Sequence, residues 1–348
     1  MTDFRLDTAT RRPQAEREAI LASPGFGSNF SDHMVLIDWN PEHGWHDHRI
    51  VGYAPFTLDP ASAVFHYAQE AFEGLKAYAH EDGSIWRFRA DVNATRFQRS
   101  ARRLALPELS VDDFLTGIDR LVEVDRDWVP RGAEQSLYLR PFMFAHSAFL
   151  AVKPSTSVTY AVIASPSGAY FGGSGVQPVK SWVSRDFSRA APGGTGFAKC
   201  GGNYAASLAA ANEAAAHGCG QVLYLDGAEH RWLEECGTMN FMMITAGGQL
   251  VTPALGSILD GITRDSILTI ARNLGIEARE KRITRDEVYC ADEAFFTGTA
   301  AEVTPIRELD NRVIGEGTRG PITTKLQTAF FDVVKGKDPA YRHWLQPV

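Results

Sequence analysis

A single lysine, Lys199, lies between two glycine clusters in the stretch 191–205, APGGTGFAKCGGNYA. A buried lysine loses part of its charge, and its amine can then attack a carbonyl carbon and form a Schiff base. The glycines on both sides allow backbone conformations that other residues avoid, and they let a flat or anionic ligand come close. The stretch therefore indicates amine chemistry at Lys199, with a solvated lysine on a surface loop as the alternative.

The neighbours of this lysine exclude a nucleotide-binding loop of the Walker type. That loop requires Gly-Lys-Ser/Thr, whereas here Ala198 precedes the lysine and Cys200 follows it. Asn203 is predicted to cap a helix, because the alanine-rich sequence after it contains strong helix formers and ends at Gly218. Lys199 is thus expected one short loop before a helix.

Two further features could serve a ligand at the lysine. Gly261 and Thr263 stand at the start of a predicted helix, 261–275, where free N–H groups and the helix dipole favour an anion such as phosphate. Glu234 and Glu235 lie at the edge of an apolar strand. Strand alternation lets only one of the two acids face inward, and a solvated strand end is the other interpretation of the pair.

Glycine, serine and proline concentrate in 165–178, SPSGAYFGGSGVQP, and predict a domain boundary between two strand patterns. Tyr170 and Phe171 stand out there, since their rings either line a cleft or pin the loop to a domain surface. A Schiff-base lysine, a phosphate site, a carboxylate and aromatic rings together point to pyridoxal phosphate, which needs them all.

The elements that must position these residues fall into separate groups, which favours the α+β class over a doubly wound sheet. Asp91 is predicted to cap a helix over 91–104 in which Phe97 faces the core, and 111–124 is a second amphipathic helix. Runs rich in β-branched and aromatic residues predict strands at 35–39, 85–88, 136–142, 158–164, 221–225, 241–245, 250–252, 278–283 and 294–296.

Length, composition and charge limit the classes of protein to which this chain can belong. The 348 residues exceed one typical domain, and 44% hydrophobic with 22% charged residues are ordinary for a globular chain. A net charge of -7 gives no reason to expect nucleic acid or an anionic membrane as a partner. The four cysteines have neither metal-site nor disulfide spacing, and the charged N-terminus lacks the apolar core of a signal peptide. We therefore expect a cytoplasmic protein with no metal site.

Eight motifs in order make the chain similar to the class IV aminotransferases, specifically the branched-chain amino acid aminotransferases, from about Phe26 to the C-terminus. They are DHM at 32–34, YAQEAFEGLKAY at 67–78, SLYLRP at 136–141, SPSGAYF at 165–171, KCGGNYAASL at 199–208, LEECGTMN at 233–240, LDGITRDSI at 259–267 and GTAAEVTPI at 298–306. The resemblance implies a fold-type IV pyridoxal-phosphate enzyme. It would have a smaller N-terminal α+β domain over 1–164, an interdomain loop over 165–176 and a larger cofactor-binding domain over 177–348.

The resemblance also implies a role for individual residues. Lys199 would form the Schiff base with pyridoxal 5'-phosphate and then move the proton of the substrate's α-carbon. Glu235, rather than Glu234, would pair with the pyridine nitrogen, and Tyr204 would lie near the phenolic oxygen. The phosphate would be bound by Arg96, the backbone amides of Ile262 and Thr263, and the hydroxyl of Thr299.

The implied reaction is reversible transamination between L-leucine, L-isoleucine or L-valine and 2-oxoglutarate. One pocket must then accept an apolar side chain and, in the second half of the reaction, a carboxylate. Arg140 would bind that carboxylate and shares a strand face with Tyr138 by alternation, while the turn around Thr299 and Ala300 would hold the α-carboxylate. The family's substrate positions fall on Phe26, Tyr67, Tyr138, Arg140, Tyr170, Thr238 and Ala300.

Family members are homodimers or larger, so a homo-oligomer is expected. Within the same fold, the alternatives are a D-amino acid aminotransferase and an aminodeoxychorismate lyase, and SLYLRP together with GTMN disfavours both. A catalytically silent binding protein would lack the lysine or a phosphate ligand, yet both Lys199 and Arg96 are present. Some relatives carry a redox cysteine pair just after the G-T-A turn, but the corresponding residues here are Ala301 and Thr304, so no thiol switch is expected there.

Overall fold

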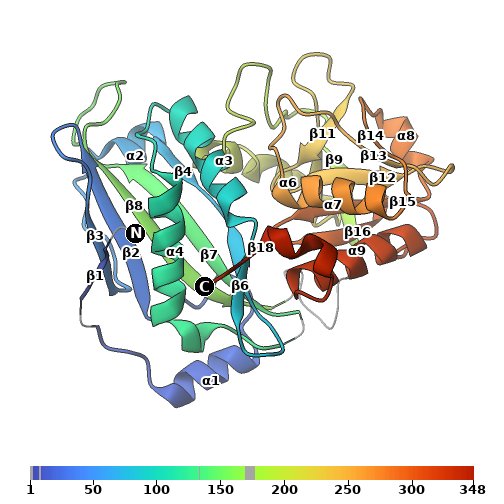
Figure 1. Cartoon of the computed structure of the whole chain (residues 1–348). Helices are drawn as coiled ribbons and strands as arrows, with labels where there is room; N and C mark the ends of the chain where they lie inside the picture. The colour runs from blue at the N-terminus through green and yellow to red at the C-terminus, as the bar shows by residue number, and fades with distance from the viewer. Residues whose placement is uncertain (1–2, 8, 133, 169–176) are drawn as a thin grey trace. The chain divides into compact units, whose positions relative to one another are not determined.

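The computed structural model describes residues 3–7, 9–132, 134–168 and 177–348 of the chain. It divides into two compact units, each built on one mixed β-sheet with helices against it (Figure 1). The first unit comprises Met1–Tyr170, Ala198–Gly201 and Pro339–Val348, and the second comprises Phe171–Phe197 and Gly202–Asp338. This architecture agrees with the predicted α+β class.

The sheet of the first unit has the strand order β1-β3-β2-β8-β7-β5-β6-β18, and β4 also pairs with β7. Antiparallel β7 and β8 form its centre, with Ser136 opposite Ser167 and Ala145 opposite Val158. The strands are β1 (Arg5–Leu6), β2 (His33–Asn40), β3 (Gly44–Gly52), β4 (Glu70–Phe72), β5 (Leu75–Ala79), β6 (Ile85–Phe88), β7 (Ser136–Ala145), β8 (Val158–Ser167) and β18 (Leu345–Pro347).

Two amphipathic helices of the first unit pack together and against its sheet (Figure 1). Their junction is aromatic, because the Phe97 ring lies 5.5 Å from that of Phe114 and 5.8 Å from that of Tyr160 on β8. Burying Phe97 turns the residue before it, Arg96, toward the protein interior as well. The helices of this unit are α1 (Gln14–Ala22), α2 (Ala63–Tyr67), α3 (Ala90–Arg103) and α4 (Val111–Val124).

The predicted cap at Asp91 is wrong. The helix begins one residue earlier, after Arg89 in the left-handed conformation with φ 49° and ψ 37°. The N–H of Arg89 donates to the carbonyl of Trp344 over 2.8 Å, a contact with the far end of the chain. Asp91 lies in the first turn, where its charge still favours the helix N-terminus.

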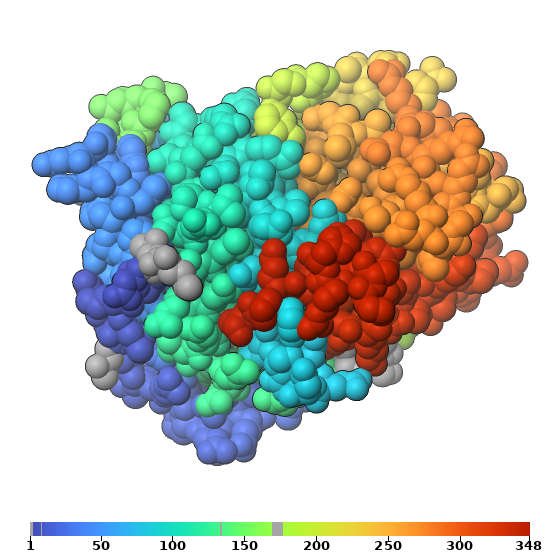
Figure 2. Space-filling view, viewed as in Figure 1, coloured from blue at the N-terminus to red at the C-terminus, as the bar shows by residue number. Residues whose placement is uncertain are grey.

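The C-terminal segment joins the first unit through β18, which pairs antiparallel with β6 and sets Leu345 opposite Phe88. In Figures 1 and 2 this red end of the chain lies against the blue-green residues of β6. A single domain boundary at 165–176 does not account for the pairing of β18 with β6, because these two strands lie more than half the chain apart in sequence. The short segment Ala198–Gly201, which carries Lys199, likewise belongs to the first unit.

The sheet of the second unit has the order β11-β10-β9-β16-β15-β12-β13-β14, with β17 paired to β16. Helices α7 and α9 pack together and against β15 and β16 (Figure 1). The strands are β9 (Val179–Val183), β10 (Gln221–Leu225), β11 (Leu233–Cys236), β12 (Asn240–Ile244), β13 (Leu250–Thr252), β14 (Ala278–Glu280), β15 (Glu293–Gly298), β16 (Glu302–Leu309) and β17 (Arg312–Val313). The helices are α6 (Leu208–Ala216), α7 (Ile262–Asn273), α8 (Arg285–Tyr289) and α9 (Pro321–Val334).

The single helix predicted after Lys199 is divided into α5 (Gly201–Ala205) and α6. Asn203, predicted as its cap, lies inside α5 and is 6% exposed. Its side chain donates to the Thr195 carbonyl over 2.9 Å and accepts from the Thr195 hydroxyl over 2.7 Å. The prediction is wrong because this asparagine holds the glycine-rich loop instead of capping a helix.

Candidate active site

Lys199 is held by backbone hydrogen bonds to two elements of the first unit. Its N–H donates to the Ser100 hydroxyl on α3 over 3.0 Å, and its carbonyl accepts from the N–H of Phe72 on β4 over 3.0 Å. The ammonium nitrogen lies 4.8 Å from the centre of the Phe72 ring. The residue keeps some exposed surface, but its amine is enclosed by protein.

The surroundings of this amine favour its neutral form. Enclosure, and then the Arg96 guanidinium, lower the pKa of Lys199 to about 8, while Glu73 and Tyr138 act in the opposite direction. Only the neutral amine attacks a carbonyl carbon. The lowered pKa of Lys199 increases the fraction of the amine that is neutral, the form that Schiff-base chemistry needs.

Arg96 faces inward and is 4% exposed. Glu73 binds its guanidinium through two oxygens, with Nε to Oε1 at 2.7 Å and Nη2 to Oε2 at 2.8 Å, and Asn93 donates to the same carboxylate over 2.7 Å. Burial raises the pKa of Glu73, but Arg96 outweighs it and holds that pKa below its ordinary value. A buried, fixed guanidinium beside Lys199 is suited to an anionic group of a ligand.

Two substitutions should move the pKa of Lys199 in opposite directions. Arg96→Gln removes a positive charge and is expected to raise it above about 8, whereas Glu73→Gln removes a negative charge and is expected to lower it. The pH dependence of amine-selective labelling of Lys199 in the apoenzyme, followed by mass spectrometry, measures both changes. In the wild type, labelling should increase with a midpoint of about 8 as the pH rises. Shifts in the same direction for both variants would contradict this electrostatic account.

Tyr138 and Arg140 share one face of β7, as alternation predicts. Arg140 Nη2 donates to the Tyr138 hydroxyl over 3.1 Å, and its guanidinium lies 4.7 Å from the centre of the Phe72 ring. The Phe26 ring meets Tyr138 edge to face at 5.1 Å. The first unit thus brings three predicted substrate residues together, with aromatic surface beside one guanidinium. Tyr67 lies at the end of α2, where its ring stacks on that of Phe149 at 6.4 Å.

The residue that follows Glu73 must be glycine, because the Tyr138 side chain lies close to the backbone of Gly74. A Cβ at Gly74 would overlap the hydroxyl oxygen of Tyr138, closer than any real contact of that kind. The close approach is therefore open to glycine alone. The motif YAQEAFEGLKAY thus supplies both the carboxylate that binds Arg96 and the space that Tyr138 occupies.

In the second unit, Glu234 and Glu235 are both buried, at 7% and 3% exposure. The prediction that only one of them faces inward is wrong. Alternation does send the two side chains to opposite faces of β11, but the protein covers both faces. Glu235 contacts Arg189, whereas Glu234 accepts a hydrogen bond from the hydroxyl of Ser257.

The carboxylate of Glu235 is fixed from three sides within the second unit. Arg189 Nη2 lies 2.5 Å from Oε1, Asn240 donates to Oε2 over 2.7 Å, and the N–H of Leu259 donates to Oε1 over 2.9 Å. Arg189 also donates to the Ser257 carbonyl over 3.0 Å. A carboxylate with such partners is held in one orientation, as the partner of a protonated ring nitrogen must be.

The start of α7 is attached to the same network. Gly261 precedes the helix, and a Cβ on it would overlap Oδ1 of Asn240, the residue that also binds Glu235. Ile262 and Thr263, the first two residues of α7, are 7% and 5% exposed. Their N–H groups belong to the helix start, where the dipole favours an anion.

The remaining predicted residues of the second unit lie on α5 and in turns. Tyr204 is half-buried on α5, and Thr238 is exposed in the turn between β11 and β12. Thr299 and Ala300 are half-buried in the turn between β15 and β16. Tyr170 and Phe171 fall outside the described residues.

Glu73, Arg189 and Asn240 are functional candidates that sequence reasoning missed. All three act by binding another predicted residue, and their partners lie 23, 46 and 5 positions away in the chain. For Glu73, its place inside the motif YAQEAFEGLKAY was the available signal. Among the described residues, no group of three or more His, Cys, Asp or Glu is placed to hold a metal ion. Within the same residues, no helix is both long and apolar enough to cross a membrane.

Comparison with known proteins shows which family shares this sequence. The family model for amino-transferase class IV matches residues 70–309. The chain is 52% identical over 343 residues to a probable branched-chain-amino-acid aminotransferase of Streptomyces coelicolor, covering 95% of this chain and 94% of the relative. It is 48% identical over 346 residues to a branched-chain-amino-acid aminotransferase of Mycobacterium tuberculosis, with the same coverage.

Solved structures show the same fold. The branched-chain amino acid aminotransferase of Escherichia coli superposes with a TM-score of 0.77 at 32% identity, over 89% of this chain and 98% of that one. The branched-chain amino acid aminotransferase from Thermobaculum terrenum, solved in its PLP form, gives a TM-score of 0.75 at 29% identity over 90% and 97% of the two chains.

Proposed function

Because the chain belongs to the class IV aminotransferase family, we propose that it catalyses the reversible transamination of L-leucine, L-isoleucine and L-valine with 2-oxoglutarate. Its fold is that of the fold-type IV enzymes, and its relatives at 48–52% identity carry the name branched-chain-amino-acid aminotransferase. The observation that carries the proposal is the first unit's combination of an activated amine, Lys199, with an aromatic face that ends in Arg140.

Pyridoxal phosphate is the cofactor of this family, and the residues present fit it. Its aldehyde needs a neutral amine, and Lys199 has a pKa of about 8. Its ring nitrogen needs a fixed carboxylate, which Glu235 offers, and its phosphate needs cationic and N–H donors of the kind at Arg96 and the start of α7. When bound, the cofactor accepts the electron pair that the substrate's α-carbon releases.

Each residue then has a defined task. Lys199 would hold the cofactor, and its Nζ would take the proton from the substrate's α-carbon. Glu235 would keep the ring nitrogen protonated, since a negative charge favours a proton on its partner. Tyr204 is assigned to the phenolic oxygen. The phosphate is assigned to Arg96, Ile262, Thr263 and Thr299.

Two demands on the substrate pocket explain the proposed substrate class. Phe26 and Tyr138 offer apolar surface for a branched side chain, and Arg140 offers a guanidinium for the second carboxylate of 2-oxoglutarate. Tyr67, Tyr170, Thr238 and Ala300 remain assigned to the same pocket by the resemblance. The α-carboxylate is assigned to the turn at Thr299 and Ala300, where backbone N–H groups can converge.

The experiment that tests the proposal is a comparison of amino donors. Purified holoenzyme with 2-oxoglutarate should form glutamate from L-leucine, L-isoleucine and L-valine. A rate with D-alanine that exceeds these would favour a D-amino acid aminotransferase instead. Pyruvate release from aminodeoxychorismate, without glutamate formation, would favour the lyase.

Arg140→Ala should weaken the binding of 2-oxoglutarate much more than the binding of L-leucine. It removes a charge-assisted hydrogen bond to the second carboxylate, which costs about 1.5–3 kcal/mol, so KM for 2-oxoglutarate should rise about tenfold or more. KM for L-leucine should change by less than about threefold, because leucine has no second carboxylate. Steady-state kinetics with each substrate varied will measure both values, with Tyr138→Phe as the control that keeps the guanidinium. Equal losses for the two substrates would remove Arg140 from this role.

A homodimer is also proposed, in the cytoplasm, where the four free cysteines would stay reduced. Three apolar side chains of the first unit are strongly exposed, Phe65 at 60%, Leu150 at 75% and Val152 at 89%. The bridge between Ser62 and Ala148 pairs the two segments that carry these side chains, and we propose that the side chains form one patch that contacts a second copy.

Charges in this patch should therefore separate the subunits. The double variant Leu150→Asp/Val152→Asp is expected to sediment as a monomer, because association would bury both carboxylates. Leu208→Asp, a control at a 64% exposed leucine of the second unit, should keep the wild-type mass. Sedimentation velocity gives the answer directly, and a wild-type mass for the double variant would place the interface elsewhere.

A further inference from the structure

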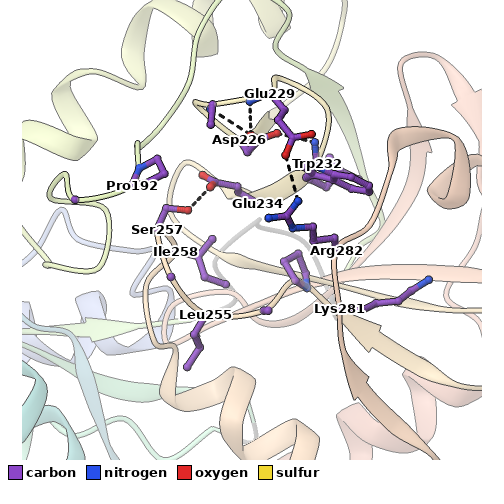
Figure 3. Close-up of a pocket in the computed structure, with 16 residues that line it drawn as sticks. Pro192, Asp226, Glu229, Trp232, Glu234, Leu255, Ser257, Ile258, Lys281 and Arg282 are labelled. Atoms are coloured by element: carbon purple, nitrogen blue, oxygen red, sulfur yellow. Dashed lines mark hydrogen bonds and ion pairs between the residues drawn. The ribbon is translucent and has the colours of Figure 1, made fainter.

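A pocket of about 420 Å³ opens in the second unit (Figure 3), and none of the assigned cofactor or substrate residues that the structure describes lines it. Its volume is in the range of pockets that hold small metabolites. Its lining includes Trp232, Glu234, Leu255, Ser257, Ile258 and Arg282.

Two polar atoms of this lining are buried without a hydrogen-bond partner among the described residues, Oε2 of Glu234 and Nε1 of Trp232. Glu234 is 7% exposed, and its other oxygen already accepts from the Ser257 hydroxyl. Burial raises the pKa of Glu234, and Ser257 and Arg189 oppose that rise. Unpaired buried polar groups are costly, so these two atoms favour a ligand that offers one donor and one acceptor.

The other charged residues that line the pocket differ in how far hydrogen bonds and ion pairs already occupy them. Burial raises the pKa of Asp226, but four backbone N–H groups donate to its carboxylate and hold that pKa at about 2. Asp226 is therefore already fully hydrogen-bonded. Lys281 pairs with Glu287 over 2.5 Å and extends away from the pocket in Figure 3. Arg282 contacts Glu229 over 3.1 Å through one nitrogen, and its guanidinium is directed into the middle of the view. Its side chain is 68% exposed and keeps further N–H donors, so Arg282 is the cation that faces this pocket from its solvent side.

Apolar side chains complete the lining. Pro192, Leu255 and Ile258 lie on the same side of the pocket in Figure 3, and Pro253 also lines the pocket. An aliphatic group would cover this wall and gain about 25 cal/mol for each Å² removed from water. The pocket therefore offers three different surfaces: a buried carboxyl, a donor pair at Trp232 and Arg282, and an aliphatic wall.

From this combination we infer that the pocket is a second, non-catalytic binding site for a free α-amino acid with an aliphatic side chain. The ammonium group of the ligand binds Oε2 of Glu234. Its carboxylate accepts from Nε1 of Trp232 and from the Arg282 guanidinium. Its side chain lies on the wall that contains Leu255 and Ile258.

The loop between β13 and α7 connects this site to Glu235. Ser257 donates to Glu234 in the pocket, and its carbonyl accepts from Arg189, the ion partner of Glu235. Two residues further on, the N–H of Leu259 donates to Glu235 itself over 2.9 Å. A ligand that fixes Ser257 therefore biases the position of two partners of Glu235. The site is suited to feedback by the same class of amino acid that the enzyme handles, a role that rests on the proposed function.

The test measures binding without turnover. Holoenzyme is first reduced with borohydride, which fixes the cofactor on Lys199 so that added amino acids cannot react with it. Titration calorimetry with L-leucine should then give saturable binding with one site per chain. Glu234→Gln should weaken it about tenfold or more, because a buried charged hydrogen bond is lost. Trp232→Phe should weaken it as well, and Arg140→Ala should leave it unchanged.

Two analogues of leucine test the assigned contacts. Isopentylamine lacks the carboxylate and 4-methylvalerate lacks the ammonium group, so each should bind about tenfold or more weakly than L-leucine. 4-Methylvalerate binding as tightly as L-leucine would overturn the role of Glu234. Absence of binding to the folded wild type, or binding that Arg140→Ala abolishes and Glu234→Gln does not, would overturn the site. Because no turnover is involved, failure here is distinct from failure of the proposed reaction.

Discussion

Lys199→Ala is expected to lower kcat for transfer from L-leucine to 2-oxoglutarate by about 10⁴-fold or more. The same amine binds the cofactor and moves the α-proton, so a methyl group can replace neither function. Lys199→Arg should lose as much, because a guanidinium stays protonated and cannot take up a proton. Steady-state rates and the visible absorption of the purified variants provide the measurement.

A surface lysine serves as the control for this experiment. Lys325 is exposed, and Lys325→Ala should retain the wild-type rate and the visible band. If Lys199→Ala kept more than about one hundredth of the wild-type kcat, the proton transfer would have to be assigned to another base. Added methylamine should restore part of the activity of Lys199→Ala, since a small amine can take over the proton transfer.

Removing Glu235 is expected to destabilise the protein as well as impair catalysis. Arg189 and Glu235 are each 4% exposed at the side chain and lie 2.5 Å apart. Glu235→Ala leaves a buried guanidinium without its counter-ion, which typically costs about 3–5 kcal/mol in free energy of unfolding. Urea denaturation of the apoenzyme measures this cost separately from any loss of cofactor.

The adjacent acid provides a matched control. Glu234 is also buried, but the hydrogen bond to its carboxyl comes from the neutral Ser257 hydroxyl. Glu234→Ala should therefore cost less, about 1.5–3 kcal/mol, the range for a single hydrogen bond to a charged group. Equal losses of stability for Glu234→Ala and Glu235→Ala would show that the Arg189 ion pair is not what distinguishes the two acids.

The sequence predicted the features that depend on local chemistry. Glycine on both sides of Lys199 indicated a special lysine, and the helical spacing placed Phe97 in the core, where it is 0% exposed. Alternation along β7 correctly placed Tyr138 and Arg140 on one face. Such predictions succeed because side-chain direction follows from the period of the element itself.

Features that depend on partners distant in the chain could not be predicted in this way. The start of α3 is fixed by a hydrogen bond from Arg89 to Trp344, and no local pattern contains that contact. Asn203 has the residue type and position of a helix cap, yet its side chain is hydrogen-bonded to Thr195 instead. The burial of Glu234 beside Glu235 depends on the loop at Ser257 that covers the second face of β11.

The most direct test of the account is a single half-reaction. Holoenzyme mixed with L-leucine in the absence of 2-oxoglutarate should lose its visible band and release one equivalent of 4-methyl-2-oxopentanoate per chain. Addition of 2-oxoglutarate should then restore the band and produce one equivalent of L-glutamate. A visible band that L-leucine leaves unchanged, or the same half-reaction in Lys199→Ala, would contradict the assignment of this chain as a branched-chain amino acid aminotransferase that acts through Lys199.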